Sequence, residues 1–197
     1  ALGEQVGVRW GGVGHLNIYD LEAAAGVAGY MGLDLVAVEL DWAAFMPAST
    51  QPPDWSAAAL AAAAARQGHF DLLLSLTNAP DWARTDKGPD AQAVRGLIEA
   101  LVQRYPEEIH AYEIFPAANT AAGWGAAPNP QAYVELLAAL KPVLQSLDPA
   151  PTLVAGGLVP VAASDQDQNL SDLTFLSAMY DTGLGRHDIV FPNLGAM

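Results

Sequence analysis

The sequence of 197 residues contains no cysteine, which excludes disulfide bonds, thiolate metal sites and a cysteine nucleophile and leaves the compartment open. Basic residues are also scarce, with 8 Lys and Arg against 22 Asp and Glu and a formal net charge of −14 at pH 7. The basic residues are scattered singly along the chain, so no local cluster offsets the negative field. We therefore expect no binding to nucleic acid or to an anionic membrane surface.

Long apolar runs are missing as well. No stretch reaches the roughly 18 uncharged apolar residues of a membrane-spanning helix, and the N-terminus lacks the basic-then-apolar pattern of a signal peptide. Direct insertion into a membrane is therefore not expected. The chain starts at Ala1 rather than at Met, which fits either removal of a signal peptide after a small residue or trimming of the sequence. With the acidic composition, this start favours an extracellular or cell-surface location.

Motifs for metals, cofactors and nucleophilic serine are also lacking. The four histidines, at positions 15, 69, 110 and 187, show no i, i+4 pairing, and neither an HExxH nor an EF-hand pattern occurs. No glycine-rich phosphate loop follows an apolar run, there is no P-loop lysine, and no serine lies in a GxSxG elbow. We expect neither a bound metal nor a cofactor.

What the sequence does contain is an alternation of apolar runs and helical patterns. The chain is 52% hydrophobic, enough for the core of one domain covering residues 1–197. Short apolar runs alternate with segments of helical periodicity. The expected strands are 6–14, 33–42, 70–77, 109–115, 151–159 and 188–192, and the expected helices are 19–32, 55–68, 88–105, 129–147 and 170–183. Asp54 is expected to cap the second helix, Pro89 to lie near the first turn of the third, and Pro142 to kink the fourth.

Strict alternation of six strands and five helices predicts an α/β fold with parallel strands. An open doubly wound sheet and a TIM-barrel-like (β/α) fold both satisfy this pattern. The missing phosphate loop and the clustering of polar and aromatic residues after several strands favour the barrel. A complete barrel takes about 250 residues, so we expect an incomplete one. The sequence leaves open whether the native chain continues past Met197 or is a dedicated six-strand module.

Polar and aromatic side chains gather at the predicted carboxyl ends of the strands. Carboxylates that bind hydroxyls, and indole faces that stack on pyranose rings, are typical of a sugar site. Glu39 and Glu113 fit equally well as carboxylates hydrogen-bonded inside a barrel, and Trp42 and Trp82 fit as packing residues. The candidates are His15 and Asn17 after the first strand; Glu39, Asp41 and Trp42; Asn78, Asp81 and Trp82; and Glu113, Asn119 and Trp124.

The order of several segments resembles the retaining glycoside hydrolases of the (β/α)₈ superfamily known as clan A, especially its xylosidase-like and cellulase-like members. The landmarks include "LVAVELDW", "LLLSLTNAPDWA", "YEIFPAANTAAGWG" and "LVAGGLVP". In that family the fourth strand reads like Y-E-I-W-N-E-P-N, and the Glu after Asn is the general acid/base. The resemblance implies a sugar site that includes Trp42, Glu39, Asn78, Trp82, Asn119 and Trp124.

The same resemblance shows where the family pattern is broken. Ala117 stands at the position of the acid/base Glu, and Ala37 at the position of an arginine that supports the nucleophile. A segment reading "FPNLG" replaces the expected His-Pro-Tyr-like segment, and the strand that carries the nucleophile lies beyond Met197. Alanine cannot donate a proton, and Glu113, earlier on the same strand, is expected too deep in the barrel to substitute.

Three functional hypotheses follow from these residues. The first is a glycosidase-like domain without catalytic activity, which serves as a carbohydrate-binding or structural component of an extracellular or surface assembly. The second is an active retaining glycoside hydrolase whose nucleophile lies in a missing C-terminal part. The third is a scaffold for a protein partner that covers the exposed barrel edges, because an open sheet edge needs such a cover.

Overall fold

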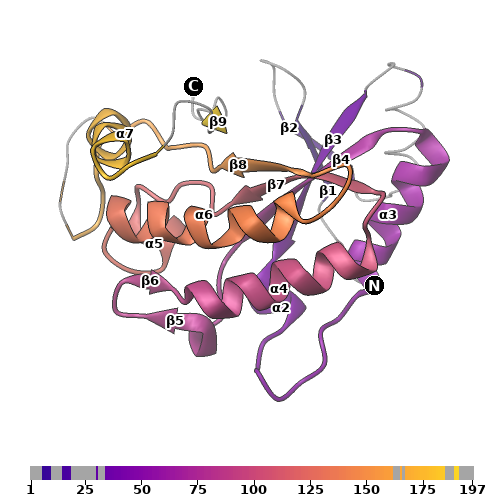
Figure 1. Cartoon of the computed structure of the whole chain (residues 1–197), viewed down its shortest axis with the longest axis horizontal. Coiled ribbons are helices and arrows are strands. Elements are labelled where there is room, and N and C mark those ends of the chain that lie inside the picture. Colours follow the sequence, from indigo (N-terminus) through magenta and orange to yellow (C-terminus); the bar gives the residue numbers. More distant parts are fainter. Residues whose placement is uncertain are drawn as a thin grey trace.

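The computed structural model describes residues 6–9, 15–18, 30, 34–161, 165, 167–184 and 189–190. Its centre is a five-stranded sheet in the order β3-β4-β7-β8-β9, and every neighbouring pair of strands is parallel (Figure 1). The strands are β3 (Leu35–Asp41), β4 (Asp71–Thr77), β7 (Ile109–Ile114), β8 (Thr152–Ala155) and β9 (Ile189–Val190). The predicted α/β class with parallel strands is thus confirmed.

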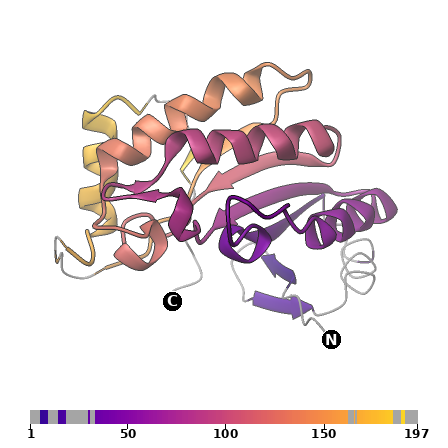
Figure 2. The ribbon, with the colours of Figure 1, turned by 90° about the horizontal axis from the view of Figure 1, so that it is seen from below.

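Among the described residues, four longer helices connect the strands of this sheet. They are α3 (Ser56–Gly68), α4 (Ala91–Arg104), α6 (Pro130–Gln145) and α7 (Asp172–Asp181). Helices α4 and α6 lie side by side over one face of the sheet (Figures 1 and 2). Short elements follow the strands at their carboxyl ends, namely α2 (Trp42–Phe45), the 3₁₀ turn η1 (Asp81–Ala83), β5 (Arg84–Thr85), β6 (Gly88–Pro89) and α5 (Ala121–Trp124).

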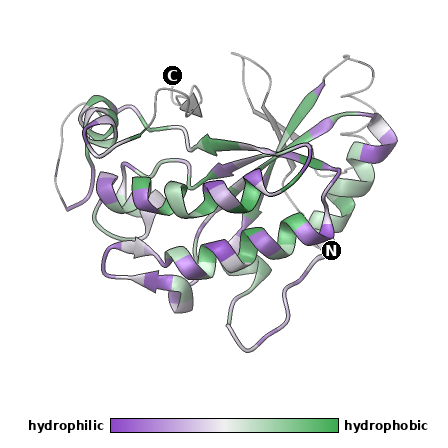
Figure 3. Ribbon diagram, in the orientation of Figure 1, coloured by the Kyte–Doolittle hydropathy of each residue, from purple (hydrophilic) through white to green (hydrophobic). Residues whose placement is uncertain are grey.

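The core lies between the sheet and these helices. Alternate strand residues such as Leu40, Leu76 and Ile114 are neighbours in register and are at most 5% exposed. Figure 3 shows the matching pattern, with largely hydrophobic strands and striped helices α4 and α6. Each fully buried leucine or isoleucine contributes about 1.5–3 kcal/mol, so this layer is the main source of stability. The other face of the sheet carries Glu39, Ser75 and Glu113 in one row.

Helix starts follow the capping rules, with two local corrections. Asn129, the first residue of the helix predicted over 129–147, is the N-cap of α6, and its side chain accepts from Ala132 N at 3.0 Å. Helix α4, however, begins after Asp90, whose carboxylate accepts from Ala93 N at 2.8 Å, and Pro89 belongs to β6. Helix α6 contains Pro142 within its span, and the kink at this residue stays a prediction.

Asp54 is not the N-cap of α3. Trp55 occupies that position, and the Asp54 carboxylate accepts from the backbone N of Ser56 at 3.0 Å. Hydrogen bonds from the side chain and the backbone of Ser56 hold the pKa of the Asp54 carboxyl below its usual value. The residue therefore supports the turn before the helix rather than the helix terminus itself.

The prediction for the start of the chain was wrong. Instead of one parallel strand over residues 6–14, the structure has an antiparallel pair, β1 (Val6–Arg9) and β2 (His15–Ile18). The sequence of residues 10–14 is rich in glycine, which is compatible with a chain reversal as well as with a short strand. His15 and Asn17 consequently lie in β2 and do not follow a strand of the central sheet. Apart from Tyr30, the predicted helix 19–32 lies outside the described residues, as do residues 188 and 191–192 of the sixth predicted strand.

In the part of the chain that the structure describes, no helix is both long enough and apolar enough to cross a membrane.

Candidate functional site

The candidate site lies at the carboxyl ends of β3 and β4. Carboxyl ends of parallel strands meet at one edge of a sheet, so residues from these strands and from the segments after them come together there. We call this set the rim; its members are Glu39, Asp41, Thr77, Asn78, Asp81, Trp82 and Arg84.

A chain of hydrogen bonds joins the polar residues of the rim. The Asn78 amide donates to both carboxylate oxygens of Asp41, at 3.0 and 3.1 Å. Arg84 Nη2 donates to Asn78 Oδ1 at 3.1 Å, and Arg84 Nη1 lies 3.6 Å from Asp81 Oδ1. The guanidinium therefore already has an amide and a carboxylate as partners. The backbone of Asn78 has φ +47°, a left-handed conformation that asparagine tolerates better than most residues.

Backbone contacts fix the position of this network. Asp41 is the N-cap of α2 and accepts from Ala44 N at 2.9 Å. Ala43 N in turn donates to Asn78 O at 2.9 Å, so the segments after β3 and β4 are joined directly. The rim between these two strands is thus built on regular elements, which hold side chains more exactly than a free loop does.

Glu39 and Glu113 occupy contrasting environments on one face of the sheet. Glu39 is exposed and accepts from Thr77 Oγ1 at 3.0 Å. Glu113 is 4% exposed and accepts from Ser75 Oγ at 2.5 Å and from Gly157 N at 3.1 Å. Of the two interpretations given for these glutamates, Glu113 fits a carboxylate that is hydrogen-bonded in the interior, and Glu39 fits a carboxylate that is exposed at the rim.

Trp82 is the aromatic residue of the rim. Its side chain is 36% exposed, and its indole Nε1 donates to Met46 O at 3.0 Å. The ring stands edge-on to Trp42, with centroids 5.5 Å apart. Because both contacts restrict the ring, Trp82 offers a fixed apolar surface beside the carboxylates.

Two other predicted aromatic platforms are buried. Trp42 is 0% exposed and Trp124 is 1% exposed, so neither ring has a face on which a sugar could stack. Trp124 Nε1 donates to Lys87 O at 2.7 Å, and its ring packs edge-on against Phe115 and Tyr133. These burials correct the interpretation of Trp42 and Trp124 as ligand-binding residues: they are core residues that hold the loops after the strands.

Asn119 is also a structural residue rather than a ligand contact. It is 0% exposed, and its amide donates to Val159 O at 2.8 Å and to Leu170 O at 2.9 Å. Its carbonyl oxygen accepts from Val159 N at 2.9 Å. With these bonds in place, the side chain ties the loop after β7 to the segment after β8, and its polar atoms face backbone groups instead of a ligand.

The segment after β7 is a tight turn around Ala117. Ala117 has φ +64°, its N donates to Gly157 O at 2.7 Å, and its O accepts from the backbone N and hydroxyl of Thr120, both at 2.9 Å. A Cβ added to Gly123 would lie 2.3 Å from Ala117 O, so the neighbouring chain packs directly against this turn. In this turn after β7, Ala117 therefore presents only a methyl group, which can neither donate nor accept a proton.

Sequence reasoning missed Arg84, Thr77, Ser75 and Gly157 as partners of the site residues. Ser75 and Thr77 alternate on β4, which signals one shared face of the sheet. Arg84 lies three residues after Asp81, the spacing of a local ion pair. Gly157 gives no sequence signal for its role, because it acts through its backbone. Among the described residues no group of three His, Asp or Glu side chains is arranged to hold a metal ion.

Comparison with known proteins places this geometry in a known fold. No protein-family model matches the sequence, and no curated protein matches it. Solved structures do match. A family 39 glycoside hydrolase from the gut symbiont Bacteroides cellulosilyticus WH2 superposes with a TM-score of 0.54 at 18% identity, over 70% of this chain and 29% of its own. The chain has the fold of glycoside hydrolase barrels.

Further glycoside hydrolase structures agree with this fold. A GH5_18 protein from Bifidobacterium longum subsp. infantis gives a TM-score of 0.53 at 16% identity, over 69% of this chain and 37% of its own. A family 1 β-glucosidase from Thermotoga maritima gives 0.51 at 10% identity, over 81% and 41%. The likeness establishes a TIM-barrel-like fold, and the chain spans between 29% and 41% of the length of these three proteins.

Proposed function

We propose that this chain is a glycosidase-like barrel domain that binds a saccharide at the rim without hydrolysing it, as a component of an extracellular or surface assembly. The observation that carries the proposal is Ala117, which occupies the turn after β7 in a fold otherwise shared with glycoside hydrolases. Loss of a general acid/base typically lowers an enzymatic rate by 10²- to 10⁴-fold.

The remaining carboxylates near β7 do not replace the missing acid. Glu113 is buried and holds hydrogen bonds from Ser75 and Gly157, so it stabilises the interior of the sheet. Retaining glycosidases need two carboxyl groups about 5 Å apart, both facing the bound sugar. Both oxygens of Glu113 already accept hydrogen bonds from the protein, so this carboxylate does not meet that requirement.

The rim keeps the features of a binding site. Trp82 presents a partly exposed indole and Glu39 presents an exposed carboxylate, while Asn78 and Asp41 are exposed but hydrogen-bonded to each other. Aromatic faces bind the C–H surface of a pyranose ring, and carboxylates accept hydrogen bonds from its hydroxyl groups. These groups support saccharide binding independently of any hydrolysis.

Hydrolysis and binding can be measured separately. A panel of aryl glycosides should yield no aglycone above the uncatalysed rate, and a glycan array should detect binding that Trp82→Ala removes. Tyr180→Ala is the matched control, because Tyr180 is an exposed aromatic residue on α7, outside the rim. Aglycone release that is abolished by Glu39→Gln or Glu113→Gln would show an active hydrolase and overturn the proposal.

A further inference from the structure

The charges of the rim are unbalanced. The rim carries three exposed carboxylates, those of Glu39, Asp41 and Asp81, and one guanidinium, that of Arg84, which is paired with Asp81. Their sum is −2 (three negative charges and one positive), within a chain whose formal net charge is −14. Arg84 donates to Asn78 and is paired with Asp81, and its Nε is buried, so negative charge outweighs positive charge at the exposed rim.

The rim carboxylates also differ in how many hydrogen bonds and ion pairs their oxygens already make. Asp41 accepts from Asn78 and from Ala44 N, so its oxygens are largely committed. Within the described part of the chain, Glu39 accepts only from Thr77 through Oε1, and Asp81 has only the longer contact to Arg84. Glu39 and Asp81 therefore keep oxygens with which a ligand could pair.

A ligand for such a site must donate hydrogen bonds and tolerate negative charge. Ionised carboxylates only accept hydrogen bonds, and a like charge placed beside them is repelled. An ammonium group supplies three donors and a positive charge, and it is also attracted to the face of an indole ring. Trp82, whose Nε1 is already bonded to Met46 O, provides such a ring next to Asp81.

Resting on the proposed saccharide-binding function, we infer that the ligand is a saccharide that carries free amino groups. Its ammonium groups pair with Glu39 and Asp81, and the pyranose ring or an ammonium group lies against Trp82. Saccharides whose amino groups are acetylated lose the charge, and saccharides built from uronic acids are repelled by the rim.

Calorimetric titration with three matched hexasaccharides tests this inference. One is made of glucosamine, the second of N-acetylglucosamine and the third of galacturonic acid, all at low ionic strength where charge effects are largest. We expect the glucosamine hexamer to bind about 4- to 25-fold more tightly than the acetylated one, because its two charge pairs, with Glu39 and Asp81, contribute about two- to fivefold each. The galacturonate hexamer should not bind, because its charges have the same sign as those of the rim.

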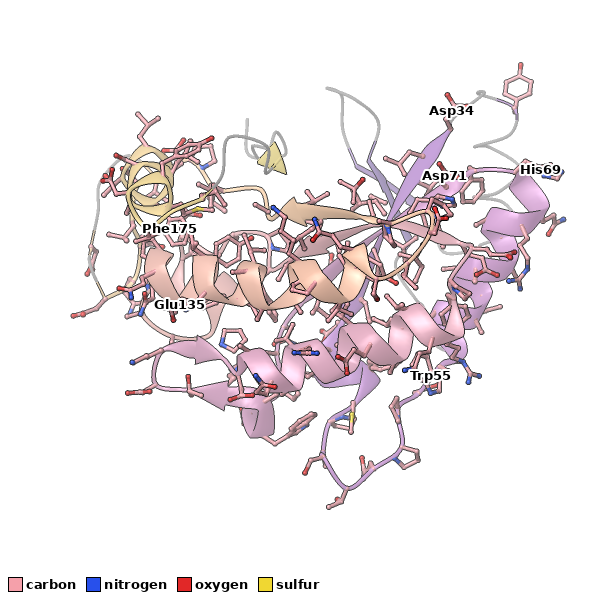
Figure 4. All side chains as sticks on the ribbon, in the orientation of Figure 1. Asp34, Trp55, His69, Asp71, Glu135 and Phe175 are labelled. Carbon is pink, nitrogen blue, oxygen red and sulfur yellow. The ribbon has the colours of Figure 1, made fainter. Side chains whose placement is uncertain are left out.

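A matched pair of double variants separates the rim from the general acidity of the chain. Glu39→Gln with Asp81→Asn removes two charges at the rim, and Asp34→Asn with Asp71→Asn removes two at the amino ends of β3 and β4. Figure 4 shows Asp34 and Asp71 together at that end, and seven residues of strand place it about 20 Å from the rim. We expect a loss of about two- to fivefold in affinity for each rim charge and a change below twofold for the control.

Each other outcome has a definite meaning. Equal losses in the two double variants would show non-specific attraction to an acidic chain and would overturn the inference. Equal or tighter binding of the acetylated or uronate hexamer, lost in Trp82→Ala, would overturn the inference while leaving the proposed function in place. If none of the three hexamers binds and the glycan array is blank, the proposed function fails together with the inference.

Discussion

Replacement of Asn119 by alanine tests whether this buried amide is a structural tie rather than a ligand contact. The substitution removes three hydrogen bonds and leaves the N and O of Val159 and the O of Leu170 without their partner. Each such bond contributes about 1 kcal/mol, and all three are partly buried, so we expect the free energy of unfolding to fall by about 3 kcal/mol. That is a large fraction of the 5–15 kcal/mol typical of a domain.

The measurement is urea denaturation followed by tryptophan fluorescence and far-ultraviolet circular dichroism. Gln131→Ala is the control, because Gln131 is an exposed residue of α6 that bonds only to Glu135, and its loss should change stability by less than about 0.5 kcal/mol. Asn119→Asp keeps the acceptor but turns a carboxylate oxygen toward two carbonyl groups, so it should be no more stable than Asn119→Ala. A loss below about 1 kcal/mol for Asn119→Ala would refute the structural role.

Three further predictions concern backbone strain and buried phenols. Ala117→Gly relieves the left-handed φ of +64° and should raise the free energy of unfolding by about 0.5–1 kcal/mol in urea titrations. Gly123→Ala brings a Cβ within 2.3 Å of Ala117 O and should lower the free energy of unfolding by about 2 kcal/mol. Its control, Gly96→Ala, lies in open space within α4 and should raise the free energy of unfolding by about 0.5–1 kcal/mol. A less stable Gly96→Ala than Gly123→Ala would contradict the structure. Burial raises the pKa of Tyr112 and of Tyr133, so the folded state keeps both phenols neutral; the part of the stability that depends on them is constant below about pH 10 and is lost as the pH rises above it. Absorbance titration at alkaline pH should show these two phenols ionising only as the protein unfolds, and early ionisation of all tyrosines in the folded state would show that they are not buried.

Much of the sheet could be predicted because its strands are buried. The run 70–77 contains four leucines and one phenylalanine among its eight residues, and the structure places β4 (Asp71–Thr77) there. The start of α6 was equally predictable, because Asn129 followed by Pro130 is a sequence typical of a helix N-terminus. The start of the chain was harder, since glycines in a short apolar segment are compatible both with one interrupted strand and with the two strands of a hairpin.

The candidate site was only partly predictable. Glu39, Asn78 and Trp82 lie at the rim as expected, because their positions relative to the strand ends follow from the period of two residues. Trp42 and Trp124 were assigned to the same surface but are buried. A tryptophan just after a strand can turn toward the core or toward solvent, and only the packing of the following short helices decides between them.

The central claim is that the rim binds a saccharide and does not hydrolyse it, and one calorimetric experiment reports both properties. When a soluble oligosaccharide that scored on the glycan array is titrated into the chain, we predict a saturable binding heat that Trp82→Ala removes and Tyr180→Ala preserves. After saturation the thermal power should return to the baseline, because no turnover follows. A sustained thermal power that disappears in Glu113→Gln, or binding that Trp82→Ala leaves intact, would contradict the account.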